Sequence, residues 1–573
     1  MNHINIFALG GLDENGKNCY VFETFDDKGE NKKIYVINSG AKIPINSNNK
    51  IDTLIPNFNY LIKNKDAIQG VFVTDVKNDS FSALPWLLMK MPTVPVFTSK
   101  FNKVLIMERL SKYKLDLKKV KINILDRPTK IGDIFVNPIE LAGSMPGHIG
   151  LDFITPSGDY LFMFNFVEAN LGIYGSLDFD EMPRKFFAKR KIKALIVDSG
   201  NSNQNCRATD KIILPRSVRE AFFSAKPNER IIVGAYDEEM YSISQILDFA
   251  YEAKRPVIAY GKTYGQVLSL IKSVVPDLKL PKILDYKYAN KVKNAVILVT
   301  GTVERLHSRF ARITDNNDVY LKLQESDTVI MIAPAINGLE SLEAVVLDDI
   351  ARVSPKVMEL NNFEFFHHHP AREDLAKLIN ILKPEYVVPA QGLYRYLQDA
   401  QRYIVKNVGF NPKNVLLLQN GQIAHFDNGK LGSYKRKIKE VGDVIVDGFG
   451  VGDINTEVLN EREVLGREGV VLVAVRYNPI KKKLIGKIQI NTVGVISKDE
   501  KSEANDLVKS TLLNVIESKK FESLREFQNV CRQAIRKKIF KIYSKEPIDC
   551  GFSMNRKTKD IHYKFKKYQK VKT

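Results

Sequence analysis

The chain has 573 residues, of which 44% are hydrophobic, and this composition is typical of a globular protein with two or three domains. Its formal net charge of +20 favours a polyanionic partner such as RNA, although a genomic bias toward Lys, Asn and Ile could also produce that charge. The short apolar runs exclude a membrane-spanning protein, and four cysteines without a C-x-x-C pair argue against a disulfide framework or a thiolate zinc site. The first residues, MNHINIFALGG, do not form a secretory signal, so we expect a cytoplasmic protein.

Short β-rich runs alternate with amphipathic segments in the first third of the chain. Residues 32–40 (KKIYVINSG) and 67–75 (AIQGVFVTD) predict strands, and residues 80–91 (SFSALPWLLMKM) predict a helix. The polar stretch DVKNDS, residues 75–80, follows the second of these strands. Proteins with α/β folds usually hold their functional residues at this end of a strand, so DVKNDS is the first candidate site.

The middle of the chain follows a helix–strand rhythm typical of a parallel sheet, which predicts a domain inserted into a loop of another. A polar segment and a small α+β region follow it. We therefore divide the chain into a first domain made of residues 1–205 and 363–425, an inserted domain at 206–362, a linker at 426–444, and a C-terminal α+β domain at 445–573 that oligomerises or contacts RNA.

Basic residues are concentrated late in the sequence. The segment from Tyr563 to Lys572 interleaves aromatic residues with lysines, which suits both phosphate contact and base stacking. Lys564, Lys566 and Lys567 are therefore candidate RNA contacts, and a solvated tail is the alternative interpretation.

The one cluster of histidines lies in FFHHHPARED, residues 365–374. Three consecutive histidines point in different directions on a regular element, which disfavours a compact tetrahedral metal site. His368, His369 and Arg372 are candidate phosphate or RNA contacts before a predicted helix, and a surface turn is the alternative. The remaining histidines are single and widely spread, so a two-metal site would lack ligands.

Long phrases of the sequence, in their order and spacing, resemble those of a known family. They include residues 6–23 (IFALGGLDENGKNCYVFE), 51–74, 234–250 and 378–397 (LINILKPEYVVPAQGLYRYL). The chain resembles ribonuclease J, a bacterial nuclease with a metallo-β-lactamase fold and an inserted β-CASP domain. The resemblance implies an α/β fold: a metallo-β-lactamase αββα sandwich, an inserted β-CASP parallel-sheet domain, and a small C-terminal α+β domain.

The resemblance does not extend to the residues that bind metal in the family. The metal loop of the family reads His-x-His-x-Asp-His, and three further ligands follow later in the chain. The corresponding positions here are Asp75, Lys77, Asp79 and Ser80 in the loop, and then Gly143, Asn165 and Gln391.

These replacements remove the neutral imidazole donors that hold divalent metal ions. The family uses two such ions, usually zinc, to activate water. Lys77 would instead place an ammonium group near the metal position, which costs several kcal/mol at about 4 Å from a dication. We therefore expect no metal cofactor and no catalytic residue, and we expect Asp79 to form an ion pair with Lys77.

Other family positions bear on RNA binding. His369 aligns with a Ser-Gly-His segment that helps to hold RNA phosphate in the family, and Ser144 is a further candidate contact. Glu238 and Glu239 replace a Ser-Asn pair of the β-CASP domain, which removes neutral donors from the RNA path.

The resemblance, taken together with the loss of the metal ligands, suggests an inactive ribonuclease J paralogue that binds RNA. Its partner would be an active ribonuclease J, or a second copy of this chain in a homodimer, in mRNA decay and RNA processing away from the membrane. One alternative is an active 5′–3′ exo- or endoribonuclease with a rearranged metal site at Asp75, Asp79 and residues 367–369. Another is an RNA-binding scaffold that has no nuclease partner.

Overall fold

The computed structural model places the described residues in two compact units, which are treated separately. The first comprises residues 1–46 and 52–451, and the second residues 47–51 and 452–573. The structure describes residues 3–553, with the exception of residues 27, 43–52, 114, 188–189, 261–264, 266–267, 270–271, 274–278, 335–339, 355, 362–364, 366–368, 435, 448–449, 452–455, 476, 479–482, 485–486, 498–499, 519–520, 522–523, 546 and 548–549.

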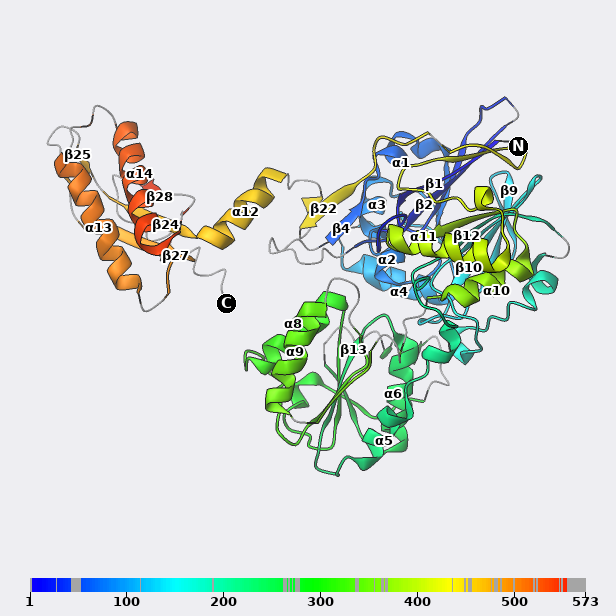
Figure 1. Ribbon diagram of the computed structural model, residues 1–573, viewed down its shortest axis with the longest axis horizontal. Coiled ribbons are helices and arrows are strands. Elements are labelled where there is room, and N and C mark those ends of the chain that lie inside the picture. The colour runs from blue at the N-terminus through cyan, green and yellow to red at the C-terminus, as the bar shows by residue number, and fades with distance from the viewer. Residues whose placement is uncertain are drawn as a thin grey trace. The chain divides into compact units, whose positions relative to one another are not determined.

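Two β-sheets form the centre of the first domain (Figure 1). The eight-stranded sheet has the order β21-β20-β1-β2-β3-β5-β6-β7 and the six-stranded sheet the order β19-β12-β11-β10-β9-β8. Strands of the first sheet are β1 (His3–Gly10), β2 (Cys19–Phe25), β3 (Lys33–Ile37), β5 (Ile68–Phe72), β6 (Val96–Thr98), β7 (Ile122–Ile124), β20 (Ala424–Asp427) and β21 (Lys430–Ser433). Strands of the second are β8 (Thr129–Ile131), β9 (Ile134–Glu140), β10 (Ile149–Thr155), β11 (Gly158–Met163), β12 (Ile192–Asp198) and β19 (Tyr386–Ala390).

Alternating side chains of these strands build the apolar layer between the sheets. Phe22 of β2 packs against Phe153 of β10 and Tyr160 of β11, with ring centroids 5.0 and 5.3 Å apart. These three rings belong to one fully buried cluster. Because side chains alternate along a strand, the opposite faces of both sheets are left for helices.

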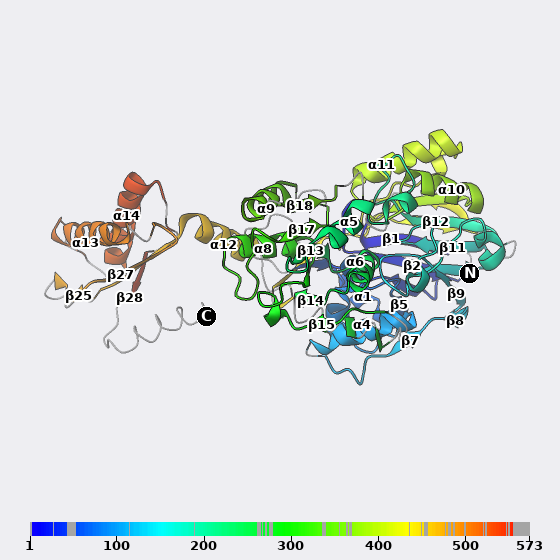
Figure 2. The same ribbon diagram turned by 90° about the horizontal axis from the view of Figure 1, so that it is seen from below.

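Helices cover those outer faces. Figure 2 shows α10 and α11 on one side of the sheets and α4 on the other, which is the predicted αββα order. The helices of this domain are α1 (Asn59–Lys63), α2 (Asn78–Phe81), α3 (Leu84–Lys90), α4 (Lys100–Ser111), α10 (Arg372–Leu382) and α11 (Tyr394–Tyr403).

The inserted domain is a parallel sheet with the order β15-β14-β16-β13-β17-β18. Its strands are near-continuous apolar runs, as expected for a sheet buried on both faces. The strands are β13 (Ile231–Tyr236), β14 (Val257–Tyr260), β15 (Ile283–Leu284), β16 (Val296–Gly301), β17 (Thr328–Met331) and β18 (Lys356–Glu359), and the helices are α5 (Arg216–Ser224), α6 (Met240–Glu252), α8 (Val303–Thr314) and α9 (Glu340–Val353).

The segment predicted as a linker, residues 426–444, is partly sheet structure. Strand β21 pairs with β20 at the edge of the eight-stranded sheet. Strand β22 (Asp443–Asp447), which overlaps the predicted start of the C-terminal domain, pairs instead with β4 (Thr53–Pro56) and with β23 (Gly450–Val451). The polar composition that suggested a linker reflects an exposed sheet edge, where side chains face water.

The second unit has its own apolar core. Val471 and Val473 of β24 share a buried cluster with Leu512 of α13 and Phe527 of α14. Its elements are α12 (Thr456–Glu468), β24 (Val470–Ala474), β25 (Tyr477–Asn478), β26 (Lys483–Leu484), β27 (Gln489–Val493), α13 (Lys501–Ser518), α14 (Leu524–Tyr543) and β28 (Cys550–Ser553). Among the described helices of the whole chain, none combines the length and apolar character needed to cross a bilayer.

Candidate functional site

The loop after β5 is held rigidly against the start of the chain. Backbone N–H groups of Asn18 and Ser39 donate to the carbonyl oxygens of Asp79 and Ser80, at 2.9 and 2.8 Å. Gly40 permits this approach, because a Cβ atom there would lie 1.5 Å from the Asp79 carbonyl oxygen. The DVKNDS loop therefore has a fixed backbone, and its side chains point into a defined site.

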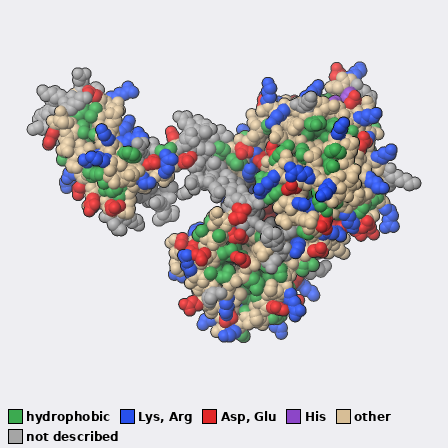
Figure 3. All heavy atoms as spheres, viewed as in Figure 1, with side chains coloured by type: hydrophobic (Ala, Val, Ile, Leu, Met, Phe, Trp, Pro, Cys, Tyr) green, Lys and Arg blue, Asp and Glu red, His purple; other side chains and the backbone are tan. Residues whose placement is uncertain are grey.

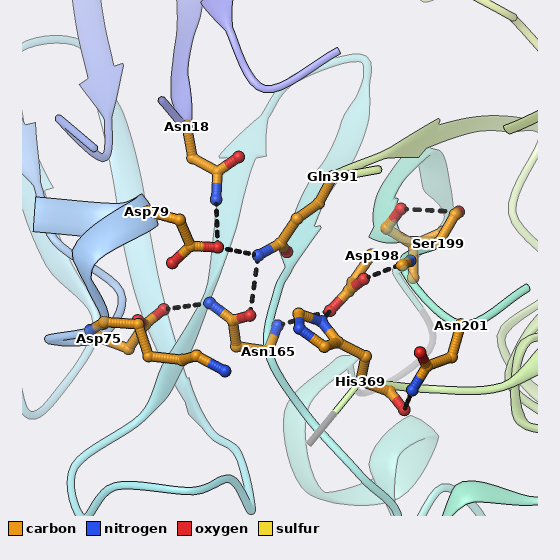
Figure 4. A network of polar contacts seen from close by, with 12 residues as sticks. Asn18, Asp75, Asp79, Asn165, Asp198, Ser199, Asn201, His369 and Gln391 are labelled. Carbon is orange, nitrogen blue, oxygen red and sulfur yellow. Dashed lines mark hydrogen bonds and ion pairs between the residues drawn. The ribbon is translucent and has the colours of Figure 1, made fainter. Parts of the chain in front are cut away.

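Asp79 is the centre of one hydrogen-bond network (Figure 4). Its Oδ2 atom accepts from Gln391 Nε2 at 2.7 Å and from Asn18 Nδ2 at 3.1 Å. Gln391 Nε2 also donates to Asn165 Oδ1 at 2.8 Å. Burial, followed by the charge of Asp75, raises the pKa of Asp79 above its usual value. Three residues from predicted ligand positions thus contact one another directly through amide donors.

Asp75 joins the same network from the other side. Its Oδ2 atom accepts from Asn165 Nδ2 at 3.2 Å and from the Ser80 hydroxyl at 3.1 Å. Its Oδ1 atom accepts from the backbone N–H of Lys77 at 3.0 Å. Both Asp75 and Ser80 are almost completely buried. Amide, hydroxyl and backbone protons therefore lie where a metal-binding carboxylate would offer its lone pairs.

Lys77 does not pair with Asp79 as predicted. Its Nζ atom lies 3.3 Å from Glu239 Oε1, and both side chains are less than one-tenth exposed. The neighbouring Glu238 accepts from the backbone N–H of Asn78 at 2.8 Å. The prediction was wrong because it considered the loop alone, whereas the inserted domain supplies a carboxylate that reaches Lys77.

The charge of Lys77 is strongly stabilised. Burial favours the neutral amine, but Glu239, Asp79 and the other nearby carboxylates, Glu238 and Asp75, outweigh burial and raise the pKa of Lys77 above its usual value. Lys77 thus remains an ammonium group that offsets part of the negative charge of the cluster.

His148 occupies the space beside Gly143. A Cβ atom added to Gly143 would lie 2.0 Å from His148 Nδ1. The same ring nitrogen lies 3.0 Å from the Asn165 carbonyl oxygen, and His148 is 1% exposed. A ligand side chain at position 143 would therefore require His148 to move.

His369 lies in a second arrangement, which shares Asn165 with this network (Figure 4). Its Nδ1 atom is 2.7 Å from Asp198 Oδ2, and Asp198 is completely buried. Asp198 also accepts from the backbone N–H of Asn165 at 2.9 Å and from that of Gly200 at 2.8 Å. The His369 ring is one-fifth exposed, so it can meet solvent or a ligand.

The other predicted RNA contacts differ in position. Arg372 is partly buried; its Nε atom donates to the Ser202 carbonyl oxygen at 2.9 Å, and its guanidinium lies over the Tyr403 ring. Ser144 is fully buried, and its carbonyl oxygen accepts from the N–H of Tyr241 in the inserted domain. His368, Lys564, Lys566 and Lys567 lie outside the described residues.

The residues at the predicted ligand positions do not fit a pair of divalent ions. Asn165 and Gln391 direct amide N–H groups at both remaining aspartates, and Lys77 adds a fixed positive charge. A different acidic group, formed by Glu168, Asp178 and Asp180, brings three carboxylates together. Two of those three already pair with Lys377, so this group is an ion-pair network on the surface.

Sequence reasoning missed three contributors to the site. Asn18 and Asp198 were not singled out, although Asp198 ends β12 at the same sheet edge as Asn165. The contact between Glu239 and Lys77 joins residues 162 positions apart. The position of Asp198 at a strand end was a usable signal, whereas no local pattern reports a contact over such a separation.

Family models match three successive segments of the chain. The ribonuclease J β-CASP domain matches residues 228–350, and the RNA specificity domain of Zn-dependent metallo-hydrolases matches residues 354–416. The ribonuclease J C-terminal domain matches residues 457–548. The chain belongs to the ribonuclease J family. Both the family and the fold expected from the sequence are thereby confirmed.

Relatives match this chain over nearly its whole length. Ribonuclease J2 of Bacillus subtilis is 26% identical and the alignment covers 95% of this chain and 97% of that protein. Ribonuclease J 2 of Staphylococcus aureus is 25% identical with the same coverage. The uncharacterized protein MG423 of Mycoplasma genitalium is 25% identical over 95% of each chain.

Proposed function

We propose that this chain is a ribonuclease J paralogue that does not hydrolyse RNA. The observation that carries the proposal is the hydrogen-bonded set of Asp79, Gln391 and Asn165. In a two-metal hydrolase, the protein must offer lone pairs to both ions and leave room for the attacking water. Here amide protons satisfy the carboxylates.

The charge of Lys77 supports the same proposal. Bringing a divalent ion to about 4 Å from an ammonium group costs several kcal/mol at an effective dielectric constant of about 20. Deprotonating Lys77 would remove that cost, but its raised pKa makes deprotonation unfavourable. The residues present therefore disfavour the binding of a divalent ion.

We further propose that the chain acts as an RNA-binding partner subunit of an active ribonuclease J in RNA decay and processing. Two relatives over nearly the whole chain carry the names Ribonuclease J2 and Ribonuclease J 2. The net charge of +20 suits an RNA partner, and Lys and Arg side chains are spread over the visible face of the first unit among acidic ones (Figure 3). The exposed edge of the His369 ring is a candidate phosphate contact.

A nuclease assay tests the loss of activity. The purified protein is incubated with 5′-monophosphorylated RNA and Mn²⁺ or Mg²⁺, beside Lys77→Ala and an active ribonuclease J as positive control. We expect neither the wild type nor the variant to degrade RNA. Metal-dependent degradation by the wild type would contradict the proposal and support the alternative of a rearranged metal site.

Co-purification tests the partner role separately. The tagged full-length chain is recovered from its own cells after RNase A treatment, so that RNA does not bridge unrelated proteins. We expect a second ribonuclease J subunit in the recovered material. Recovery of this chain alone or as a homodimer, repeated at low salt, would count against the hetero-oligomer.

A further inference from the structure

A cavity of about 290 Å³ lies where the first domain meets the inserted domain, and neither the metal positions nor His369 line it. Trp86, Arg109 and Tyr113 line it from α3, α4 and the segment after α4. Thr302 and Arg305 line it from the start of α8. Ligand sites in proteins are often found between domains and have volumes of this order upward.

Polar atoms in the wall of this cavity lack partners. Trp86 is 5% exposed, and its Nε1 atom has no hydrogen-bond partner among the described residues. The same holds for Arg109 Nε and Thr302 Oγ1 within the described part of the chain. Leaving buried donors unpaired is costly, so three of them around one cavity point to a ligand that accepts hydrogen bonds.

The charge around the cavity favours an anion. Within the described residues, no carboxylate lies within 4 Å of the guanidinium groups of Arg109 or Arg305. Arg309, one turn further along α8, donates to the carbonyl oxygens of Tyr260 and Thr300. Asp237 faces all three arginines electrostatically, and the adjacent Glu238 is held by the N–H of Asn78 in the cavity wall, so the arginines outnumber these two carboxylates. Thr302 also begins α8, whose N-terminal end favours negative charge.

Aromatic rings provide the second half of the recognition surface. Trp86 and Tyr113 meet edge to face with ring centroids 5.4 Å apart, and the Arg109 guanidinium lies over the Tyr113 ring at 5.7 Å. Aromatic rings beside arginines are the combination by which proteins bind a nucleobase and a phosphate together.

We infer that this cavity binds a free nucleoside 5′-monophosphate. Arg109 and Arg305 hold the phosphate, and the base lies against Trp86 and Tyr113. A volume near 290 Å³ accommodates one nucleotide rather than a strand. Asn78 is part of the cavity wall, and its N–H is held by Glu238 beside the Lys77–Glu239 pair.

Trp86 is the single tryptophan of the chain, so its fluorescence reports on this cavity. The full-length protein is titrated with each of the four common nucleoside 5′-monophosphates, with adenosine, with inorganic phosphate, and with an oligoribonucleotide lacking a 5′-phosphate. We expect at least one monophosphate to change Trp86 emission saturably. Adenosine and inorganic phosphate should each bind about tenfold more weakly or worse, because each lacks half of the contacts.

Variants assign the binding to the named residues. Arg109→Gln and Arg305→Gln should each weaken nucleotide binding about tenfold or more, since each loses a charge-assisted hydrogen bond. Arg352→Gln is the matched control, because Arg352 is an exposed arginine of α9 outside the cavity, and its affinity should stay within about twofold. Trp86→Phe, measured by calorimetry, should weaken binding through loss of the indole N–H.

Three results would overturn the inference. The first is the absence of saturable binding of any monophosphate, or binding that neither arginine variant weakens. The second is inorganic phosphate binding as tightly as the nucleotide, which would leave a simple anion site. The third is that the oligoribonucleotide changes Trp86 emission while none of the monophosphates does. Circular dichroism of each variant separates a lost contact from a lost fold.

Discussion

The two halves of the candidate site, one around Asp79 and one around Asp198, differ in what their side chains offer. The half around Asp79 is closed on itself, because Gln391, Asn165 and Asn18 satisfy its carboxylates. The half around Asp198 is held as firmly through the backbone N–H groups of Asn165 and Gly200, yet it presents a partly exposed imidazole, His369.

The difference lies in the side chains and not in the scaffold, because backbone hydrogen bonds hold both halves in place. Asn165 serves both halves: its side chain donates to Asp75, while its backbone N–H donates to Asp198. Asn165 and Gln391 both adopt left-handed backbone conformations, with φ of 51° and 58°. Left-handed conformations carry backbone strain in residues other than glycine. The fold nevertheless holds Asn165 and Gln391, whose side chains are amides, in this conformation.

Removing Lys77 should have the largest effect on stability. Lys77→Met leaves Glu239 and its neighbouring carboxylates buried without their cation, which we expect to cost about 3–5 kcal/mol of unfolding free energy. Urea denaturation measures this loss. Addition of Mn²⁺ should restore part of it in the variant, because the carboxylates then lack a counter-charge, and should leave the wild type unchanged.

The control for this variant is Lys112→Met, which breaks an exposed pair with Glu108 and should cost less than about 1 kcal/mol. Equal losses in the two variants would show that the Lys77–Glu239 pair is not the buried bridge between domains that the structure describes.

Removing the amide of Gln391 should have the next largest effect. Gln391→Met leaves Asp79 and Asn165 without a shared donor, at an expected cost of about 1–3 kcal/mol. The exposed Gln324→Met variant should change unfolding free energy by less than about 0.5 kcal/mol in the same urea titration. If Gln391→Met leaves the unfolding free energy unchanged, water or a metal ion satisfies Asp79 instead.

The pH dependence of stability should change when Asp79 is neutralised. Because burial raises the pKa of Asp79 above 3.8 in the folded protein, folding retains this proton to higher pH than the unfolded chain does. The contribution of Asp79 to stability is therefore greatest at low pH and is lost as the pH rises through the folded-state pKa. Asp79→Asn removes this dependence, so its stability relative to the wild type should rise as the pH increases above 3.8.

Thermal unfolding across that pH range measures the trend, and the exposed Asp116→Asn variant should keep a constant difference from the wild type. If Asp79→Asn instead becomes relatively less stable as the pH rises, the Asp79 carboxylate is stabilised as an anion, as a metal ligand would be.

The smallest expected effect is that of a chelator. Dialysis against EDTA should change the Tm of the wild type by no more than about 1 °C, because stability gained from ligand binding is lost when the ligand is removed. A drop of several degrees that Zn²⁺ or Mn²⁺ reverses would place a structural or catalytic metal in the protein.

The sequence predicted the family, the sheet architecture and the convergence of Asp75, Asp79, Asn165 and Gln391. These predictions rested on long family-like stretches of sequence and on the periodicity of apolar residues in the strands. Both remain recognisable although the residues at the metal positions differ from those of the family. It could not predict that Glu239 would pair with Lys77, since that contact depends on how the inserted domain docks. It also misread residues 430–433, where exposed edge strands carry the same polar composition as a linker.

The cavity near Trp86 was equally hidden from sequence reasoning. Its lining residues come from separate stretches of the chain, between Ala41 and Val446, and each stretch taken alone is an ordinary helix, strand or turn. Only the packing of the first domain against the inserted domain brings Arg109 and Arg305 to the same cavity.

The metal content of the purified wild-type protein, measured by mass spectrometry with the protein concentration determined independently, tests the central claim most directly. We predict well below one equivalent of zinc, manganese or any other divalent transition metal per chain, even after incubation with excess metal and removal of the unbound fraction. About two equivalents per chain would contradict it, because a chain that holds two such ions would have kept the metal-binding site of its family.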